Sequence, residues 1–256
     1  MFKIERQAYI ENELKKNKSV LISDLCQALD CSMETIRRDL KELEAAGKAQ
    51  RIYGGAFLPE ENDLGVPAKL RETFFPMEKR QMAEHALSFI SKGDVIMLDA
   101  STTCLKLSQA ILEADLPITI ITNSLRICYI FNEQPNAAPR IICLGGELHA
   151  KTNSFIGYKT TNELNEYIAD KSFISCPAVD MTFGLTDNNL ASAMVRKGMI
   201  DHSRKRFLIA DHTKFSSNAS VLIAGLSVVD TIITDKPLPP RWEAECINKK
   251  IHLEYL

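Results

Sequence analysis

The stretch Cys31-Ser-Met-Glu-Thr-Ile-Arg-Arg-Asp-Leu-Lys-Glu-Leu43 decides how the first part of the chain folds. Its apolar side chains recur at steps of three, four and three residues, at Met33, Ile36, Leu40 and Leu43. Because this is the spacing of one helix face, the stretch predicts an amphipathic helix. Ser32 is expected to cap it, since a serine hydroxyl accepts a hydrogen bond from a backbone N–H of the first turn.

The opposite face of this helix is polar and carries Glu34, Thr35, Arg37, Arg38 and Lys41. An arginine can donate two hydrogen bonds to O6 and N7 of guanine in the DNA major groove, so the face suits DNA recognition. An isolated Arg-Arg pair more often marks a solvated helix face. The flanking sequence therefore has to decide between the two interpretations.

A second short helix is expected just before this one. Ser23 is placed to cap a helix over residues 24–29, and a three-residue turn joins it to the helix that follows. This arrangement is a helix-turn-helix, and a further helix over residues 4–16 is expected to pack behind it. Gly47 suits the left-handed end of the third helix. Residues 48–56 then predict a strand, a turn and a returning strand, which form the wing of a winged helix.

Three motifs of this region resemble the DeoR family of bacterial transcription regulators. They are Thr35-Ile-Arg-Arg-Asp-Leu40, the Gly47 that follows, and Arg51-Ile-Tyr-Gly-Gly-Ala56. The family usually has a histidine where this chain has Tyr53. The resemblance implies a regulator that oligomerises, as a homodimer or homotetramer, and binds a repeated operator in double-stranded DNA. The residues expected to contact the DNA are Ser32, Glu34, Thr35, Arg37, Arg38, Lys41, Arg51 and Tyr53.

The charge of the chain limits how it can bind DNA. Residues 1–57 contain ten basic and nine acidic residues, and the whole chain of 256 residues has a formal net charge of −2. This balance argues against a structural protein that coats nucleic acid along its whole surface. A single head is expected to bind weakly, so that two or more heads are needed for useful affinity.

The remaining composition is that of an ordinary globular protein, 45% hydrophobic and 25% charged. The seven cysteines are scattered without a C-x-x-C pair, which predicts reduced thiols and no metal site or cofactor. No apolar run is long enough to span a membrane. The first residues, Met-Phe-Lys-Ile-Glu-Arg, do not resemble a secretion signal, so we expect a cytoplasmic protein.

The composition changes after the wing. Residues 58–75 are acidic and punctuated by proline and glycine, which is typical of a linker. Pro76 suits the first turn of a new helix. We therefore expect a DNA-binding domain over residues 1–57, a linker over 58–75 and a second domain over 76–256.

The second domain alternates apolar strands with helical patterns. The strands are expected at residues 95–98, 118–122, 141–144, 172–176, 207–210 and 231–234, and the helices at 105–112, 125–131, 161–168 and 191–201. This alternation predicts an α/β fold with a mostly parallel sheet that is covered on both faces. In such sheets ligands bind beyond the carboxyl ends of the strands.

Polar residues follow several of these strands. In Asp99-Ala-Ser-Thr-Thr-Cys104, hydroxyls and backbone N–H groups stand where a strand meets a helix, which suits a phosphate, although plain N-capping by Ser101 or Thr102 is about as good an explanation. Asn123-Ser124 and Gly145-Gly146 follow the next two strands. Asp211 and Lys214 follow a fourth strand, where the alternative is a surface lysine near an acid. Several such ends converging in one crevice favour a ligand site.

This second domain resembles the DeoR-type sensor domain, which is similar in fold to ribose-5-phosphate isomerase, glucosamine-6-phosphate deaminase and coenzyme A transferases. The resemblance implies a phosphorylated sugar as effector and these contacts: Asp99, Ser101, Thr102, Thr103, Asn123, Gly146, Asp211 and Lys214. The wording of residues 99–104 is most similar to the branch that controls L-fucose use. The chain departs from the family pattern at Pro177, Ser192 and Met194.

Two functions are compatible with this organisation: a sugar-phosphate-responsive regulator, or a sugar-phosphate isomerase or deaminase with an accessory head. An isomerase needs a general base against the substrate carbon. The matching region, residues 176–184, has only Asp180 and lacks the Lys-Gly-Gly-Gly turn of the isomerases. We therefore expect no catalytic residues and a regulator of carbohydrate catabolism, with repression as the more common outcome in the family.

Overall fold

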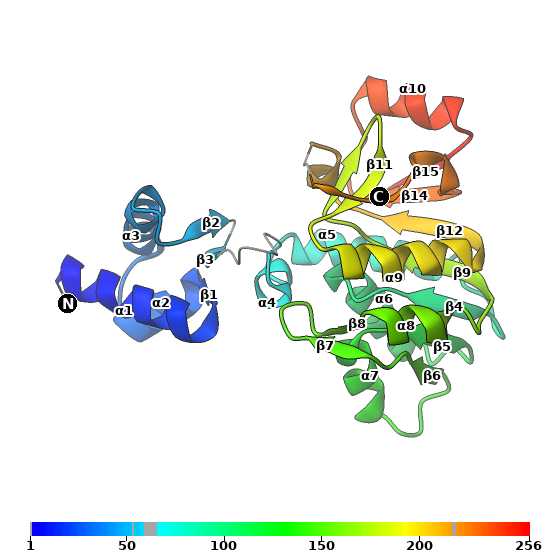
Figure 1. Ribbon diagram of the computed structural model, residues 1–256, viewed down its shortest axis with the longest axis horizontal. Coiled ribbons are helices and arrows are strands. Elements are labelled where there is room, and N and C mark those ends of the chain that lie inside the picture. Colours follow the sequence, from blue (N-terminus) through cyan, green and yellow to red (C-terminus); the bar gives the residue numbers. More distant parts are fainter. Residues whose placement is uncertain (1, 53, 59–65, 217–218) are drawn as a thin grey trace. The chain divides into compact units, whose positions relative to one another are not determined.

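The computed structural model describes residues 2–52, 54–58, 66–216 and 219–256. They form two compact units, which adjoin in the sequence between Phe74 and Phe75 (Figure 1). Within the described residues, no helix combines the length and the apolar character needed to cross a membrane. Each unit is described by itself.

The first unit is a winged helix. Its elements are α1 (Lys3–Asn17), β1 (Ser19–Leu21), α2 (Ile22–Leu29), α3 (Met33–Ala45), β2 (Gln50–Ile52), β3 (Gly55–Phe57) and α4 (Ala68–Arg71). The three strands form an antiparallel sheet in the order β1-β3-β2. Ile10 and Leu14 of α1 and Ile36 and Leu40 of α3 are almost fully buried in its core. The predicted helix-turn-helix and wing are confirmed.

Local chemistry sets both ends of α3. Ser32 Oγ accepts a hydrogen bond from the Thr35 N–H at 3.3 Å, which confirms the predicted cap. At the other end, Gly47 has a φ of 71°, and its N–H donates to the Glu44 carbonyl at 2.9 Å. The Lys48 N–H reaches back to the Leu43 carbonyl at 2.9 Å. This paired pattern is a Schellman motif, and it confirms Gly47 as the left-handed end.

Three details of the first unit differ from the sequence analysis. Met33 is 56% exposed because it lies in the first turn of α3, before the helix reaches the core. Asp39, which the apolar pattern did not place in the core, is buried. Arg6 of α1 forms an ion pair with its carboxylate and donates a second hydrogen bond to it at 3.1 Å. The predicted cap by Ser23 is wrong, since α2 begins at Ile22 without a side-chain cap.

Part of the expected linker belongs to the first unit. Residues 66–74 contain α4, and Leu70 of this helix is fully buried. Gly55 allows the approach, because a Cβ at this position would lie 2.9 Å from Leu70 Cδ2. Residues 59–65 lie outside the described residues.

The second unit is built on a seven-stranded sheet. Its strands are β4 (Val95–Leu98), β5 (Thr119–Thr122), β6 (Arg140–Cys143), β9 (Ala169–Ile174), β12 (Ser203–Ile209), β14 (Thr231–Thr234) and β15 (His252–Tyr255). Their order is β15-β14-β12-β9-β4-β5-β6, and each neighbouring pair is parallel. This confirms the predicted α/β fold and six of its strands. The edge strand β15 was not predicted.

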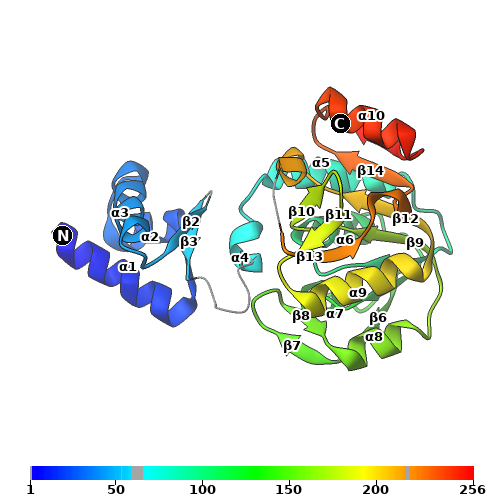
Figure 2. The same cartoon turned by 45° about the horizontal axis from the view of Figure 1, so that its top comes forward.

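Helices cover both faces of this sheet (Figure 2). One face packs on α5 (Pro76–Leu87), α6 (Thr102–Glu113) and α7 (Leu125–Asn132), and the other on α8 (Tyr158–Leu164), α9 (Leu190–Asp201) and α10 (Pro240–Asn248). In β4, Ile96 and Leu98 belong to the first core and Met97 to the second. Because both faces are buried, the strands are continuously apolar.

Two smaller sheets were not predicted. One is a hairpin of β7 (Glu147–His149) and β8 (Ser154–Ile156), and the other joins β10 (Ala178–Asp180), β11 (Gly184–Asp187) and β13 (Val221–Ala224). Short 3-10 helices are η1 (His212–Ser216) and η2 (Leu226–Val228). Each of these sheets contributes residues to the polar cluster described next.

Candidate functional site

The polar face of α3 is free to contact another molecule. Glu34, Arg37, Arg38 and Lys41 are all exposed. Within the part of the chain that the structure describes, no carboxylate pairs with Arg37 or Lys41. These two side chains are therefore available to base edges and phosphates without first breaking an ion pair.

Three other residues expected to contact DNA, Ser32, Thr35 and Arg51, already make hydrogen bonds within the unit. Ser32 and Thr35 bond to each other at the start of α3, with 2.9 Å between their hydroxyl oxygens. Arg51 Nε donates to Glu44 Oε2 at 2.7 Å, and the Arg51 N–H donates to the same carboxylate at 2.8 Å. These hydrogen bonds keep the pKa of Glu44 below its ordinary value and tie the wing to α3. Tyr53 lies outside the described residues.

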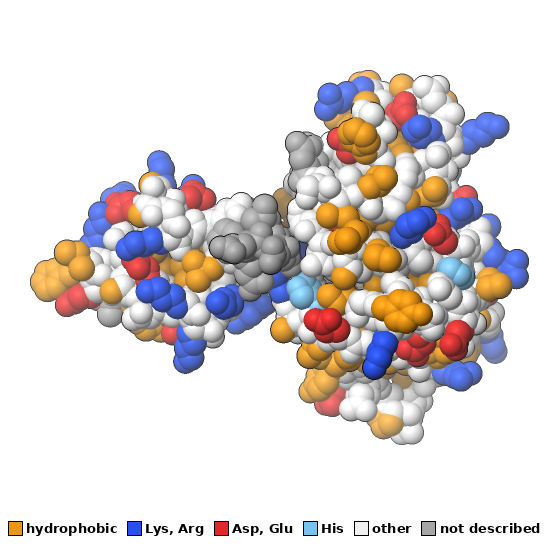
Figure 3. Space-filling view, in the orientation of Figure 1, with side chains coloured by type: hydrophobic (Ala, Val, Ile, Leu, Met, Phe, Trp, Pro, Cys, Tyr) orange, Lys and Arg blue, Asp and Glu red, His pale blue; other side chains and the backbone are white. Residues whose placement is uncertain are grey.

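On the face of the first unit that Figure 3 shows, basic side chains do not form one continuous patch. The space-filling view shows Lys and Arg on this face with Asp and Glu between them (Figure 3). This agrees with a net charge of only +1 over residues 1–57. A net charge this small provides little long-range attraction to the DNA backbone.

In the second unit, the end of β4 is organised by Asp99. The Ser101 N–H donates to Asp99 Oδ1 at 3.1 Å, and Ser101 Oγ caps α6 by accepting from the Cys104 N–H at 3.0 Å. The structure thus confirms that Ser101 caps α6. The next two N–H groups, those of Thr102 and Thr103, have no acceptor among the described residues. They point from the first turn of a helix, where partial positive charge favours an anion.

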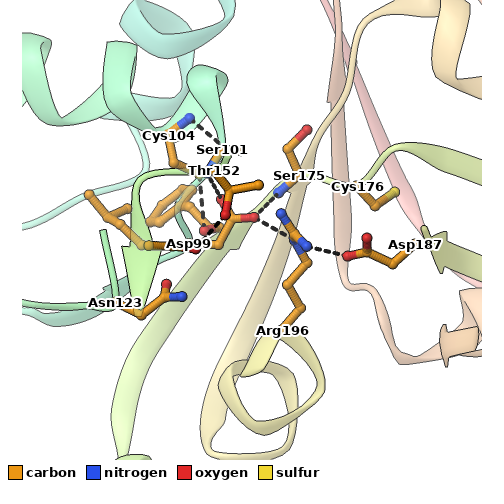
Figure 4. Close-up of polar contacts among 12 residues, drawn as sticks. Asp99, Ser101, Cys104, Asn123, Thr152, Ser175, Cys176, Asp187 and Arg196 are labelled. Atoms are coloured by element: carbon orange, nitrogen blue, oxygen red, sulfur yellow. Dashed lines mark hydrogen bonds and ion pairs between the residues drawn. The ribbon is translucent and has the colours of Figure 1, made fainter. Parts of the chain in front are cut away.

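A buried ion-pair network crosses this site (Figure 4). Arg196 of α9 reaches between two carboxylates: its Nε donates to Asp99 Oδ2 at 2.7 Å and its Nη1 to Asp187 Oδ2. The three side chains are between 2% and 9% exposed. Burial acts to lower the pKa of Arg196, but Asp187 and Asp99 raise it above its ordinary value. Asp99 is therefore an ion-pair partner and an organiser of the loop rather than a free phosphate contact.

Asn123, at the end of β5, has one satisfied and one unsatisfied polar atom. Its Nδ2 donates to the Phe155 carbonyl of the β7–β8 hairpin at 2.8 Å. Its Oδ1 is buried and accepts no hydrogen bond from any described residue. A buried acceptor without a partner is costly, so this atom is suited to receive a donor from a ligand.

A small hollow joins these groups. Its volume is about 10 Å³, enough for about one water, and it is lined by Asp99, Ala100, Asn123, Thr152, Ser154, Ser192, Val195 and Arg196. Sequence reasoning missed Arg196, Asp187, Thr152 and Ser154 as members of the cluster. The sequence did hold a signal that Arg196 is buried. This arginine lies between Val195 and Met199, which are both on the buried side of a helix.

Six of the eight expected contacts do not line this hollow: Ser101, Thr102 and Thr103 lie just beyond its Asp99-Ala100 wall, and Gly146, Asp211 and Lys214 lie elsewhere. Gly146 has a φ of 144° and packs on α8, where a Cβ would lie 2.1 Å from Thr160 Oγ1, so it serves a close approach. Asp211 is buried and accepts from the Thr213 N–H at 3.1 Å, while Lys214 Nζ lies 4.0 Å from its Oδ2. Lys214 does act on the same neighbourhood: burial raises the pKa of Cys176 to about 12, against the lowering effects of Arg196 and Lys214.

The cluster offers binding groups but no evident base. Asp180, the one carboxylate in the region that matches the isomerases, accepts the Thr182 and Phe183 N–H groups at 2.8 Å each and so closes a turn. In the described ranges, no three His, Cys, Asp or Glu side chains are grouped to hold a metal ion. The geometry provides backbone N–H groups that can donate to an anion, a buried arginine, and a buried acceptor without a partner, Asn123 Oδ1.

Comparison with known proteins gives a consistent picture. The model of the DeoR-like helix-turn-helix domain matches residues 6–62, and that of the DeoR C-terminal sensor domain matches residues 75–236. The chain is 33% identical to the uncharacterized HTH-type transcriptional regulator YulB of Bacillus subtilis, over 98% of this chain and 96% of the relative. It is 31% identical to the L-fucose operon activator of Escherichia coli, over 91% and 96%.

Among solved structures, part of the chain is similar to ribose 5-phosphate isomerase A from Methanocaldococcus jannaschii. The match has a TM-score of 0.39 and 18% identity, and it covers 54% of this chain and 53% of the isomerase. The two family models together span both units, and the relatives over nearly the full length are transcriptional regulators rather than enzymes. The chain therefore belongs to the DeoR family of helix-turn-helix transcriptional regulators.

Proposed function

We propose that this regulator acts in the cytoplasm on a carbohydrate-catabolism operon, most simply as a repressor, and that a phosphorylated sugar bound to the second unit controls it. The observation that carries the proposal is the unpartnered Asn123 Oδ1, in a residue that lines a hollow together with Arg196 and with Asp99 and Ala100 of the loop that leads into α6. The N–H groups at the start of α6 suit the phosphate of a sugar phosphate, and Asn123 Oδ1 suits a hydroxyl of its sugar.

Each group has a distinct role in this account. The Thr102 and Thr103 N–H groups and hydroxyls receive the phosphate at the start of α6, with Ser101 fixing the first turn. Asn123 Oδ1 accepts a hydrogen bond from a sugar hydroxyl, which removes the cost of its burial. Lys214, held near Asp211, supplies a cation from the neighbouring strand end.

Two or more first units act together on the operator. Arg37 and Arg38 of α3 read bases in the major groove, and Arg51 with the wing contacts the backbone. Because each head carries little net positive charge, a homodimer or homotetramer supplies the affinity. The name of the relative from Escherichia coli, an L-fucose operon activator, supports a sugar operon as the target.

The effector proposal is tested by thermal shift with ribose 5-phosphate, fructose 6-phosphate and L-fucose 1-phosphate, each beside its unphosphorylated sugar. We expect at least one phosphate to stabilise the protein and its parent sugar to have little effect, since the α6 start binds the anion. Stabilisation by none of a broader panel of sugar phosphates would contradict the proposal. The same samples are analysed for turnover, which we expect to be absent.

The role of Lys214 is tested by Lys214→Ala, with Lys236→Ala as a control at an exposed position. Operator affinity should stay at the wild-type value because the change lies in the second unit. The effector concentration for half-maximal response should rise on the order of tenfold, the worth of one charge-assisted hydrogen bond. An unchanged response would remove Lys214 from the site.

A further inference from the structure

The hollow at the site is far too small for the effector proposed above. Its volume of about 10 Å³ admits about one water, whereas a sugar phosphate has more than ten heavy atoms. Some part of the lining must therefore move when the effector binds. The part that moves determines how effector binding affects the rest of the molecule. This inference rests on the proposed function.

Two parts of the structure around the hollow are held firmly. The start of α6 is anchored by Cys104 and Leu105, which are buried in the core. The β7–β8 hairpin is tied to the end of β5 by backbone hydrogen bonds, from the Phe155 N–H to the Asn123 carbonyl at 2.8 Å and from the Leu125 N–H to the Asn153 carbonyl at 3.0 Å. Opening either part breaks packing or backbone pairing.

The side chain of Arg196 is held differently. Its guanidinium is held by ion pairs to Asp99 and Asp187, and an arriving phosphate competes for the same donors. Two buried carboxylates share this one guanidinium, so the cluster carries one uncompensated negative charge. An anion that enters this cluster binds most favourably if Arg196 breaks its ion pair with one of the two carboxylates.

Asp187 is the carboxylate that Arg196 can release. Asp99 lies on the loop that leads to the Thr102 and Thr103 N–H groups, so Arg196 can keep Asp99 while it reaches an anion bound there. Asp187 comes from β11, on a different element. It also keeps other donors, since its Oδ1 accepts from the Asn188 and Asn189 N–H groups at 2.7 and 3.1 Å.

We propose that Arg196 exchanges Asp187 for the anionic group of the effector, and that this exchange reports occupancy to β11 and to the start of α9. Asp187 stands at the junction of these two elements, because β11 ends there and the Asn189 side chain caps α9 through the Ser192 N–H at 2.9 Å. Once the arginine leaves, the junction is no longer fixed to the loop after β4.

The exchange predicts that Asp187→Asn strengthens phosphate binding, whereas most substitutions at a binding site weaken it. The variant removes the competitor for Arg196, so inorganic phosphate should bind about tenfold tighter than to the wild type, the effect expected for one charge-assisted hydrogen bond. A residue with a purely structural role would weaken or spare binding. The matched control is Asp180→Asn, which removes the same charge from the same small sheet without a contact to Arg196.

The experiment uses the full chain. Calorimetry measures inorganic phosphate and the best sugar phosphate of the panel on the wild type and both variants, and ¹⁵N NMR of labelled arginine follows the Arg196 Nε–H signal of the wild type during the titration. Operator affinity is measured on a duplex selected from a random library. We expect Asp187→Asn to bind phosphate more tightly, the Arg196 signal to shift, and the operator response of the variant to fall below that of Asp180→Asn.

The outcomes separate this inference from the proposed function. If the wild type binds the sugar phosphate but the Arg196 signal does not move, and Asp187→Asn keeps its full operator response, the exchange is wrong and the effector site stands. If the variant fails to fold, the wild-type NMR titration still decides. If the wild type binds no phosphate compound, both the proposed function and the exchange are contradicted.

Discussion

At the residue scale, the polar cluster at the end of β4 is held together by Arg196 of α9, whose guanidinium pairs with both Asp99 and Asp187. Asn123 directly follows an apolar strand and Ser101 lies three residues after another, which marks both as strand-end residues. Asp99 was expected to face a ligand, but Arg196 occupies one of its oxygens. The two are 97 residues apart, and no local pattern connects them. Ion pairs of this kind depend on which helix covers which strand, so sequence alone does not identify them.

The exposed arginines of α3 give the first prediction. Arg37→Ala should weaken binding to the preferred operator by about 1–3 kcal/mol and relax the preference at one base pair, because a bidentate contact to a base edge is lost. Competition binding with duplexes substituted one base at a time measures this. Lys15→Ala, an exposed change on α1, serves as control. Equal weakening on every duplex would make Arg37 a phosphate contact.

A second prediction concerns the thiol pair of Cys128 and Cys143. The Cys128 thiol donates to Cys143 and lowers the pKa of Cys143 to about 7, while the pKa of Cys128 is raised. Since the thiolate is the nucleophile, alkylation of the exposed Cys143 should be half-maximal near this pH. Cys128→Ala removes the donor and should move the midpoint to higher pH. Peptide mass spectrometry after timed iodoacetamide treatment measures it, and an unmoved midpoint would contradict the pairing.

At the scale of elements, local chemistry predicted boundaries well and distant pairing poorly. Ser32 and Gly47 set the ends of α3 through bonds within a few residues, and both were evident in the sequence. The apolar strands of the main sheet were also evident, because burial on both faces leaves continuous apolar runs. The two small sheets were missed, since their strands are three or four residues long and their register is set by partners elsewhere.

The contact between α1 and α3 gives a prediction at this scale. Asp39→Asn breaks the buried pair with Arg6 and should destabilise the first unit by about 2–3 kcal/mol, because the guanidinium loses its buried partner. Calorimetric unfolding should show a lower midpoint for the first unit and an unchanged one for the second. Glu42→Gln, which affects an exposed pair with Lys3, should cause little change. Equal effects of the two variants would show that burial does not matter here.

At the scale of the whole molecule, the division into two units separates DNA reading from effector sensing. The first unit is nearly neutral, so its affinity for a single half-site is expected to be low. Joining two heads through associated second units raises the effective concentration of the second head. We therefore propose that association of two or more chains supplies affinity that the contacts of one head do not.

This gives a prediction about operator architecture. A duplex with two half-sites should bind about a hundredfold tighter than a duplex with one, as expected for bivalent binding. Fluorescence anisotropy on matched duplexes of equal length measures the ratio, and sedimentation at the same concentrations gives the number of chains bound. Equal affinities for one and two half-sites would contradict the need for paired heads.

The most direct test of the central claim measures operator affinity with and without the stabilising sugar phosphate while NMR quantifies that compound in the same tube. The account predicts that affinity changes on the order of tenfold, a usual allosteric coupling, and that the sugar phosphate is recovered unchanged. Conversion of the sugar phosphate, or an operator affinity that ignores it at saturation, would contradict a sensor that binds its effector without transforming it.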